Sequence, residues 1–120
     1  MRVLITGSRT WSHRQFIWEQ FREMLRRYPV DPHDITVISG TAAGADVICE
    51  SVAEAYGMTV ERHPANWGQY GKRAGFIRND EMVRTGADLC LAFIRDNSKG
   101  ATMCADLAEA AGIQTVRFYQ

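Results

Sequence analysis

The sequence predicts a single α/β domain over residues 1–120, built on a mainly parallel sheet of five strands. Short apolar runs alternate with longer segments of helical periodicity along the chain, which is the pattern of a parallel sheet covered by helices. A length of 120 residues and a hydrophobic content of 46% suit one domain with its own core. No linker, internal repeat or low-complexity tract divides the chain.

Five apolar runs predict the strands, at residues 2–6, 35–39, 59–62, 89–94 and 115–119. Because crossovers between parallel strands are right-handed, the expected order is 3-2-1-4-5, as in a Rossmann-like three-layer α/β/α domain. The first and fourth strands are then neighbours, at the point where the strand order reverses. Ligands of such sheets bind at the carboxyl ends of the strands at this point.

Helical spacing predicts four helices between these strands. The first should begin near Ser12, where Gln15 completes a capping box, and run to about Tyr28. The other three are expected at about residues 45–56, 74–84 and 101–111, each followed by a glycine that can cap the helix end. The segment 63–73 shows no periodicity, and long loops of this kind are often functional.

Glycine-containing turns follow the first, second and fourth strands, at residues 6–9, 39–46 and 97–102. Such a turn frees backbone N–H groups, and the start of the next helix adds its positive dipole end, so together they can bind a phosphate. One turn alone would be ordinary turn chemistry. Three turns at one edge of the sheet favour a ligand site, with Gly7, Ser8, Ser39, Gly40, Thr41, Gly44, Ser98, Lys99, Gly100 and Thr102 as candidate contacts.

Side chains beside these turns could complete the site. Arg9 could bind a phosphate or carboxylate. Trp11 could stack on a base or pack at the start of the helix, and the sequence supports both equally. Asp46 could hold a ribose hydroxyl, although stabilising the start of its own helix is a slightly better supported role.

The aperiodic segment adds Asn66, Trp67 and Lys72, a mixture that suits contacts with a nucleobase and a phosphate. A loop folded back onto the domain is the alternative. Arg78 and Asn79 stand near the front of the third predicted helix and could reach the same crevice. For Arg78 the alternative is a surface ion pair with a neighbouring carboxylate.

Composition and spacing argue against several classes of protein. Fourteen basic and fourteen acidic residues give zero formal net charge, which makes a general nucleic-acid binder an improbable class. The turns match neither the dinucleotide fingerprint G-x-G-x-x-G nor the P-loop. No apolar stretch approaches the roughly 20 residues of a membrane span. Three cysteines without C-x-x-C spacing suggest reduced thiols in a cytoplasmic protein, and we expect neither a metal nor a cofactor.

Five segments of the chain, residues 7–9, 39–46, 64–67, 74–82 and 98–102, resemble the YspA-type branch of the SLOG superfamily. The likeness spans nearly the whole chain. It implies a Rossmann-like domain that binds nucleotides or nucleotide-derived ligands, as found in bacteria and phages. The superfamily includes the LOG-type phosphoribohydrolases and the DNA-processing protein DprA. Because the sheet leaves edge strands and the helices carry aromatic faces, a homodimer is also expected, as in LOG relatives.

The resemblance also bears on catalysis. Arg78 and Met82 match the Arg-x-x-x-Met motif of LOG enzymes, in which the arginine is catalytic. Their glycine-rich loop leads to a catalytic glutamate, but here Cys104 or Ala105 stands at that place. We therefore expect a module that senses or sequesters an ADP-ribose-like or NAD-like ligand. Hydrolysis of an N-glycosidic or phosphate-ester bond is the alternative, and its carboxylate would have to come from elsewhere, from Asp46 or Glu50.

Overall fold

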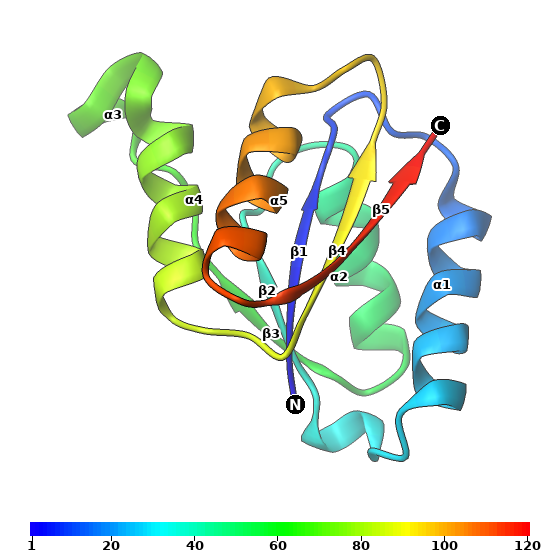
Figure 1. The fold of residues 1–120 in the computed structure, drawn as a ribbon. Coiled ribbons are helices and arrows are strands. Elements are labelled where there is room, and N and C mark those ends of the chain that lie inside the picture. Colours follow the sequence, from blue (N-terminus) through cyan, green and yellow to red (C-terminus); the bar gives the residue numbers. More distant parts are fainter.

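Five parallel strands form one sheet in the computed structural model, which describes residues 1–120. The strands are β1 (Arg2–Gly7), β2 (Thr36–Ser39), β3 (Thr59–Arg62), β4 (Leu89–Ile94) and β5 (Gln114–Tyr119). They lie in the order β3-β2-β1-β4-β5, with Val3 paired to both Val37 and Leu89 (Figure 1). The predicted parallel sheet and its strand order are confirmed.

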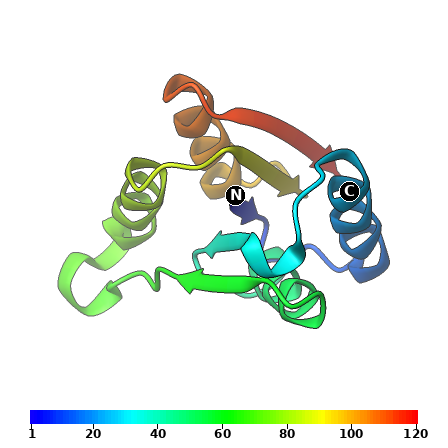
Figure 2. The same ribbon diagram turned by 90° about the horizontal axis from the view of Figure 1, so that it is seen from below.

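Helices cover both faces of the sheet, which gives the predicted three layers (Figure 2). Helices α1 (Arg14–Arg27) and α2 (Ala45–Ala55) pack on one face, and α4 (Ala74–Arg84) and α5 (Lys99–Ala110) pack on the other. The connections contain the one-turn helix α3 (Trp67–Tyr70) and the 3-10 turns η1 (Pro32–Asp34) and η2 (Gly71–Arg73). None of the helices has the length and apolarity that crossing a membrane requires.

The central strand β1 contributes to both cores. Successive side chains of a strand point to opposite faces, so Val3 and Ile5 pack with the residues of α1 and α2, whereas Leu4 packs with those of α4 and α5. All three side chains are fully buried. The carboxyl end of β1 is therefore fixed in the middle of the sheet, where the first glycine-containing turn begins.

The start of α1 differs from the prediction. The helix begins at Arg14, and no side chain caps it. Ser12 is instead bound to Gln120, since its N–H donates to Oε1 at 3.1 Å and its hydroxyl accepts from Nε2 at 3.0 Å. The predicted capping box of Ser12 and Gln15 is wrong, because Ser12 is hydrogen-bonded to Gln120 at the end of the chain.

The segment 63–73 is not entirely irregular, since it contains α3. The side chain of Asn66 caps this helix by accepting a hydrogen bond from the Gln69 N–H at 3.0 Å. One helical turn is too short to give a periodic sequence signal, which explains why the sequence pattern indicated only a loop here.

Candidate functional site

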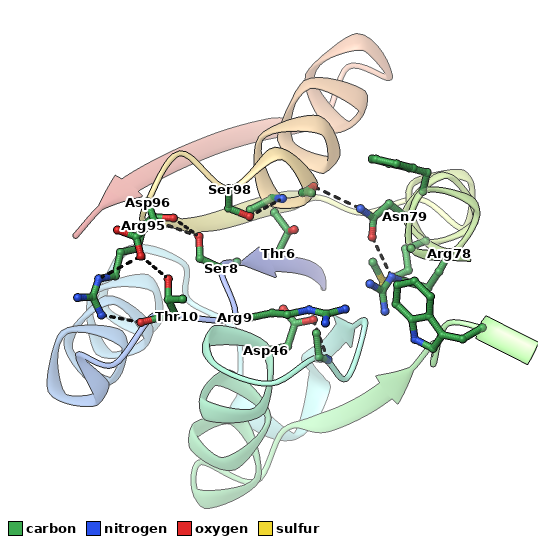
Figure 3. A pocket seen from close by; sticks show the side chains of 18 of the residues that line it. Thr6, Ser8, Arg9, Thr10, Asp46, Arg78, Asn79, Arg95, Asp96 and Ser98 are labelled. Atoms are coloured by element: carbon green, nitrogen blue, oxygen red, sulfur yellow. Dashed lines mark hydrogen bonds and ion pairs between the residues drawn. The ribbon is translucent and has the colours of Figure 1, made fainter. Parts of the chain in front are cut away.

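A cavity of about 360 Å³ opens at the carboxyl edge of the sheet, at the switch point between β1 and β4. Its walls come from the turn after β1, the start of α2, the α3–α4 region and the start of α5 (Figure 3). The predicted site residues that line it are Gly7, Ser8, Arg9, Asp46, Trp67, Lys72, Arg78, Asn79, Ser98 and Gly100. The structure thus brings side chains from four separate segments of the chain to one cavity.

The first and third turns are bonded directly to each other. The Ser8 hydroxyl donates to the Arg95 carbonyl at 2.9 Å and accepts from the Arg95 N–H at 2.7 Å. The Thr10 hydroxyl donates to Asp96 Oδ2 at 2.9 Å, and Arg95 Nη1 donates to the Thr10 carbonyl at 2.7 Å. These contacts join the two turns into one continuous wall.

The second turn packs against the first through Gly44. This residue has φ of +83°, and a Cβ there would lie 2.4 Å from the Arg9 carbonyl oxygen and 2.5 Å from that of Ser8. Glycine is therefore required both by the conformation and by the close approach of the backbone. The N–H of Ala45, at the start of α2, donates to the Ser8 carbonyl at 3.1 Å. All three turns consequently meet at the same edge of the sheet.

Most of the second turn supports the cavity from behind. The N–H of Thr41 donates to Ser39 Oγ at 3.1 Å, and the N–H of Ala42 donates to Asp46 Oδ2 at 3.2 Å. These backbone donors are thus already satisfied within the chain. Ser39, Gly40, Thr41 and Gly44 were predicted as ligand contacts, but they do not line the cavity.

Four other predicted ligand contacts also lie outside the cavity. Trp11 is only 3% exposed and packs against Phe16 and Phe93, so its packing interpretation holds rather than base stacking. Asn66 caps α3. Lys99 and Thr102 face a separate shallow hollow beside Tyr119.

The start of α5 presents a backbone donor to the cavity. Ser98 caps the helix by accepting a hydrogen bond from the Ala101 N–H at 3.4 Å, whereas the N–H of Gly100, which lines the cavity, has no partner within the chain. Open space surrounds the position that a Cβ of Gly100 would occupy. Unpaired N–H groups at a helix start are the usual donors to a phosphate.

Arg78 is held in place by three acceptors. Its Nε donates to Asn79 Oδ1 at 2.8 Å, and its Nη1 donates to the carbonyls of Gly40 and, at 3.5 Å, of His63. The guanidinium lies against the Cα of Gly40, where a Cβ would come within 2.6 Å of Nη1. Arg78 forms no ion pair with Asp80 or Glu81, the surface alternative considered from the sequence. It is a fixed cation at the cavity wall.

Asp46 is the buried carboxyl group of the cavity, with only 4% of the residue exposed. Its Oδ2 accepts the Ala42 N–H, but its Oδ1 has no hydrogen-bond partner. Burial raises the pKa of Asp46 from 3.8 to about 7, against the lowering effect of the Ala42 hydrogen bond and of the Arg78 charge. A buried carboxyl group with such a pKa in a cleft marks a candidate functional residue.

Glu50, the other carboxylate considered for a catalytic role, lies outside the cavity. It is 6% exposed and accepts hydrogen bonds from Ser39 Oγ at 2.7 Å and Arg62 Nε at 2.8 Å. Both of its oxygens are therefore engaged in holding α2 to β2 and β3. Of the two carboxyl groups considered for a catalytic role, only Asp46 lines the cavity.

Exposed aromatic rings form the far wall. Trp67 and Phe76 line the cavity and are 49% and 46% exposed. The Arg9 guanidinium carbon lies 5.5 Å from the centroid of the Trp67 ring, within the range of a cation–π contact. Arg9 makes no side-chain hydrogen bond or ion pair, so it is free to turn toward a bound anion.

Sequence reasoning missed several lining residues, namely Thr6, Thr10, Ala42, Gly75, Phe76, Met82, Arg95, Asp96 and Ala101. Arg95 directly follows β4, and its place at the carboxyl end of a central strand was a usable signal. Phe76 gave no such signal, because a lone aromatic in a short helix is more often part of the core. Four cations, Arg9, Lys72, Arg78 and Arg95, and two acids, Asp46 and Asp96, thus line the cavity.

A three-layer α/β domain whose parallel sheet has this strand order belongs to the class of Rossmann-like folds, and the cavity lies at the switch point of its sheet. The chain belongs to the YspA, cpYpsA-related SLOG family, whose model matches residues 1–70. It is also similar to the Gene 61 protein of Mycobacterium phage D29, with 43% identity over 122 residues, which cover 98% of this chain and 95% of the phage protein. The predicted family is confirmed.

Proposed function

We propose that this protein binds a nucleotide or a nucleotide-derived ligand, such as an ADP-ribose-like or NAD-like molecule, and acts as a sensor or sequestering module in bacterial or phage stress or conflict. Membership of the SLOG family supports this proposal. The observation that carries it is the combination, in one cavity, of four cationic side chains, a free backbone donor and an aromatic wall. The cavity volume falls within the range of about 300–1,000 Å³ usual for small-molecule sites.

The polar end of the cavity suits phosphate. The unpaired N–H of Gly100 lies at the start of α5, close to the Ser98 cap, and Arg95 lies beside the bonded turns. Arg9, Lys72 and Arg78 add positive charge to the same cavity. Preorganised N–H groups and guanidinium groups are the standard ligands of phosphate oxygens in proteins.

The aromatic end suits a nucleobase. Trp67 and Phe76 line the cavity and remain about half exposed although they are large apolar side chains. A base stacked on an aromatic ring gains about 1–3 kcal/mol. A ligand that joins a base to a phosphate would therefore satisfy both ends of the cavity.

The test is a binding panel of AMP, ADP, ADP-ribose and NAD, followed by isothermal titration and thermal shift. Arg78→Ala should weaken binding of the tightest ligand at least about tenfold, because it removes a fixed, charged hydrogen-bond donor. Arg84→Ala is the matched control, since Arg84 is on the same helix but is 79% exposed and pairs with Asp80. Arg78→Lys guards against a loss caused by misfolding. If no ligand of the panel binds at millimolar concentration, the proposal fails.

Hydrolysis of an N-glycosidic or phosphate-ester bond is the second candidate, and Asp46 is the observation that favours it. Such reactions need a carboxyl group that can exchange a proton near neutral pH, and Asp46 has this property inside the cavity. Chromatography of the same incubations tests this candidate. Product that disappears in both Arg78→Ala and Asp46→Asn would establish an enzyme, whereas binding without product would leave a binding module.

Three further expectations belong to the proposal. A homodimer, expected from the sequence, is testable by sedimentation equilibrium. A cytoplasmic location is supported by three buried cysteines that form no disulfide. Single-stranded DNA binding is not proposed because the net charge is zero, and a salt-titrated gel shift that showed tight binding would reverse this choice.

A further inference from the structure

The Asp46 Oδ1 atom is the only buried side-chain nitrogen or oxygen in the protein without a hydrogen-bond partner. An unpaired buried acceptor is costly, so native proteins nearly always supply a donor to it. The residue lines the cavity, and its other oxygen is already held by the Ala42 N–H. Because Asp46 lines the cavity, a bound ligand can supply the donor.

No side chain of the protein serves as that donor. The charges of Arg78 and Arg9 both act on Asp46, but neither guanidinium is hydrogen-bonded to it. The Nε and Nη1 groups of Arg78 are committed to Asn79, Gly40 and His63. Arg9 makes only the cation–π contact with Trp67.

The position of Asp46 in the cavity indicates which part of a ligand lies there. In Figure 3, Arg95, Thr10 and Ser98 lie toward one end and Arg78 and Asn79 toward the other, with Asp46 and Thr6 between them. Asp46 thus lies in the middle of the cavity, between the turn that follows β4 and the side chains of α4. In a nucleotide, the sugar is the part that joins the phosphate to the base.

The chemistry of the donor agrees with this position. An anionic phosphate offers no donor to an ionised carboxylate and repels it. A sugar hydroxyl carries no charge, and it can donate to the carboxylate or accept from the protonated acid, so it suits Asp46 in either protonation state. We propose that Asp46 accepts a hydrogen bond from a ribose hydroxyl of the ligand and makes the site selective for ribonucleotides over deoxyribonucleotides. This inference rests on the proposed function.

The selectivity should be large enough to measure. A ligand that lacks the hydroxyl leaves the buried carboxyl group unpaired in the complex, and sites built to bond a hydroxyl discriminate strongly against analogues without it. We expect the wild-type protein to bind AMP at least about tenfold more tightly than 2′-deoxy-AMP or 3′-deoxy-AMP, whichever lacks the bonded group.

The experiment is isothermal titration of the full chain with AMP, 2′-deoxy-AMP and 3′-deoxy-AMP. Asp46→Ala should reduce the ribose preference to less than about threefold, through weaker AMP binding and unchanged or tighter binding of the deoxy analogue. Asp46→Asn, which keeps the side-chain shape, covers the case in which the alanine variant folds poorly, and its preference should also fall. Asp80→Asn is the control, because Asp80 lies on α4 outside the cavity and pairs with the exposed Arg84, so the ribose preference of this variant should stay at the wild-type value.

The outcomes separate the two proposals. If wild-type protein binds AMP and both deoxy analogues equally, the proposed function stands and the role of Asp46 is overturned. The same conclusion follows if the preference survives unchanged in Asp46→Ala and Asp46→Asn. If no nucleotide of any kind binds the wild-type protein, the proposed function fails, and this inference fails with it.

Discussion

The hydroxyl of Ser8 and the backbone of Arg95, which are 87 residues apart in the chain, share two hydrogen bonds of 2.9 and 2.7 Å. Ser8 is 2% exposed, so both bonds are protected from water. One short side chain thus replaces the partners that the turn after β4 would otherwise need. The wall of the candidate ligand site depends on this contact.

Replacement of Ser8 by alanine should lower the free energy of unfolding by about 1–3 kcal/mol, because the N–H and carbonyl of Arg95 lose their partner. Urea denaturation measures this change. Ser51→Ala is the control, since Ser51 is exposed and only accepts one hydrogen bond from Arg14. If Ser8→Ala and Ser51→Ala lowered the free energy of unfolding equally, the Ser8–Arg95 hydrogen bonds would contribute no more to stability than an exposed contact.

Two glycines of the second turn should respond differently to alanine. A Cβ at Gly44 meets backbone carbonyl oxygens at 2.4 and 2.5 Å and also requires φ of +83°, so Gly44→Ala should destabilise the fold severely. The three atoms nearest to a Cβ at Gly40 all belong to the Arg78 side chain, which would be displaced from its hydrogen bonds while the backbone stays in place. Gly40→Ala should therefore weaken binding of the nucleotide probe more than it lowers the melting temperature.

Gly100→Ala completes this series as the permissive control. Nothing lies within 4 Å of its added Cβ, and the residue stands in the first turn of α5, where alanine favours the helix. Its melting temperature should stay at or slightly above that of the wild-type protein. A melting temperature for Gly44→Ala as high as that of Gly100→Ala would contradict the close packing of the first two turns.

The contribution of Asp46 to the free energy of unfolding should fall as the pH rises from about 4 to about 7. Burial raises its pKa from 3.8 to about 7, so in this range the folded protein holds a proton that the unfolded chain has lost. The asparagine of Asp46→Asn does not titrate, so the variant does not lose stability in this way. The unfolding free energy of the variant minus that of wild type should therefore increase by about 2 kcal/mol between pH 5 and pH 7.

Urea denaturation of both proteins at several pH values measures this difference. Asp80→Asn provides the control, because Asp80 is an exposed residue on α4 that pairs with Arg84. Parallel stability curves for wild type and Asp46→Asn would show that the Asp46 carboxyl group is not held in the buried environment described above.

Glu61 has the opposite dependence on pH. Hydrogen bonds from Arg2 and then His63 lower the pKa of this carboxyl group from 4.5 to about 2. Its contribution to stability is therefore present above about pH 4.5 and is lost as the pH falls toward 2. Because the side chain is 35% exposed, we expect Glu61→Gln to lower the unfolding free energy at pH 7 by less than about 1 kcal/mol.

The check is the difference between Glu61→Gln and wild type in acid, which should shrink as the pH is lowered from 5 to 2.5. Glu19→Gln, a change at an exposed carboxylate of α1 without an ion pair, should show no such trend. A difference that stays constant over this range would mean that the Arg2–Glu61 pair contributes nothing to stability.

The sequence alone was sufficient for the architecture. The order of strands and helices followed from apolar runs and helical spacing, and the strand order followed from the handedness of crossovers. Boundaries were less certain where distant residues take part. Ser12 was predicted to cap α1, but Gln120, 108 residues away, binds it instead.

The site could be predicted only in outline. The sequence located the edge of the sheet, since three strand-to-helix turns must gather at the carboxyl ends of parallel strands. It did not decide between stacking and packing for Trp11, because that choice depends on the nearness of Phe93 in the folded chain. It named Asp46 and Glu50 alike as replacements for a catalytic carboxylate, although it predicted only Asp46 as a ligand contact.

The amino-acid order by itself determined the fold class, the three turns and their common edge, because these depend on local periodicity and on rules of chain connection. Only the tertiary structure decided which polar groups of the turns remain free. Glu50 is satisfied by Arg62 from β3, whereas Asp46, one turn earlier on the same helix, keeps an unpaired oxygen in the cavity. Whether a polar group is free depends on partners that are far away in sequence, so local pattern cannot determine it.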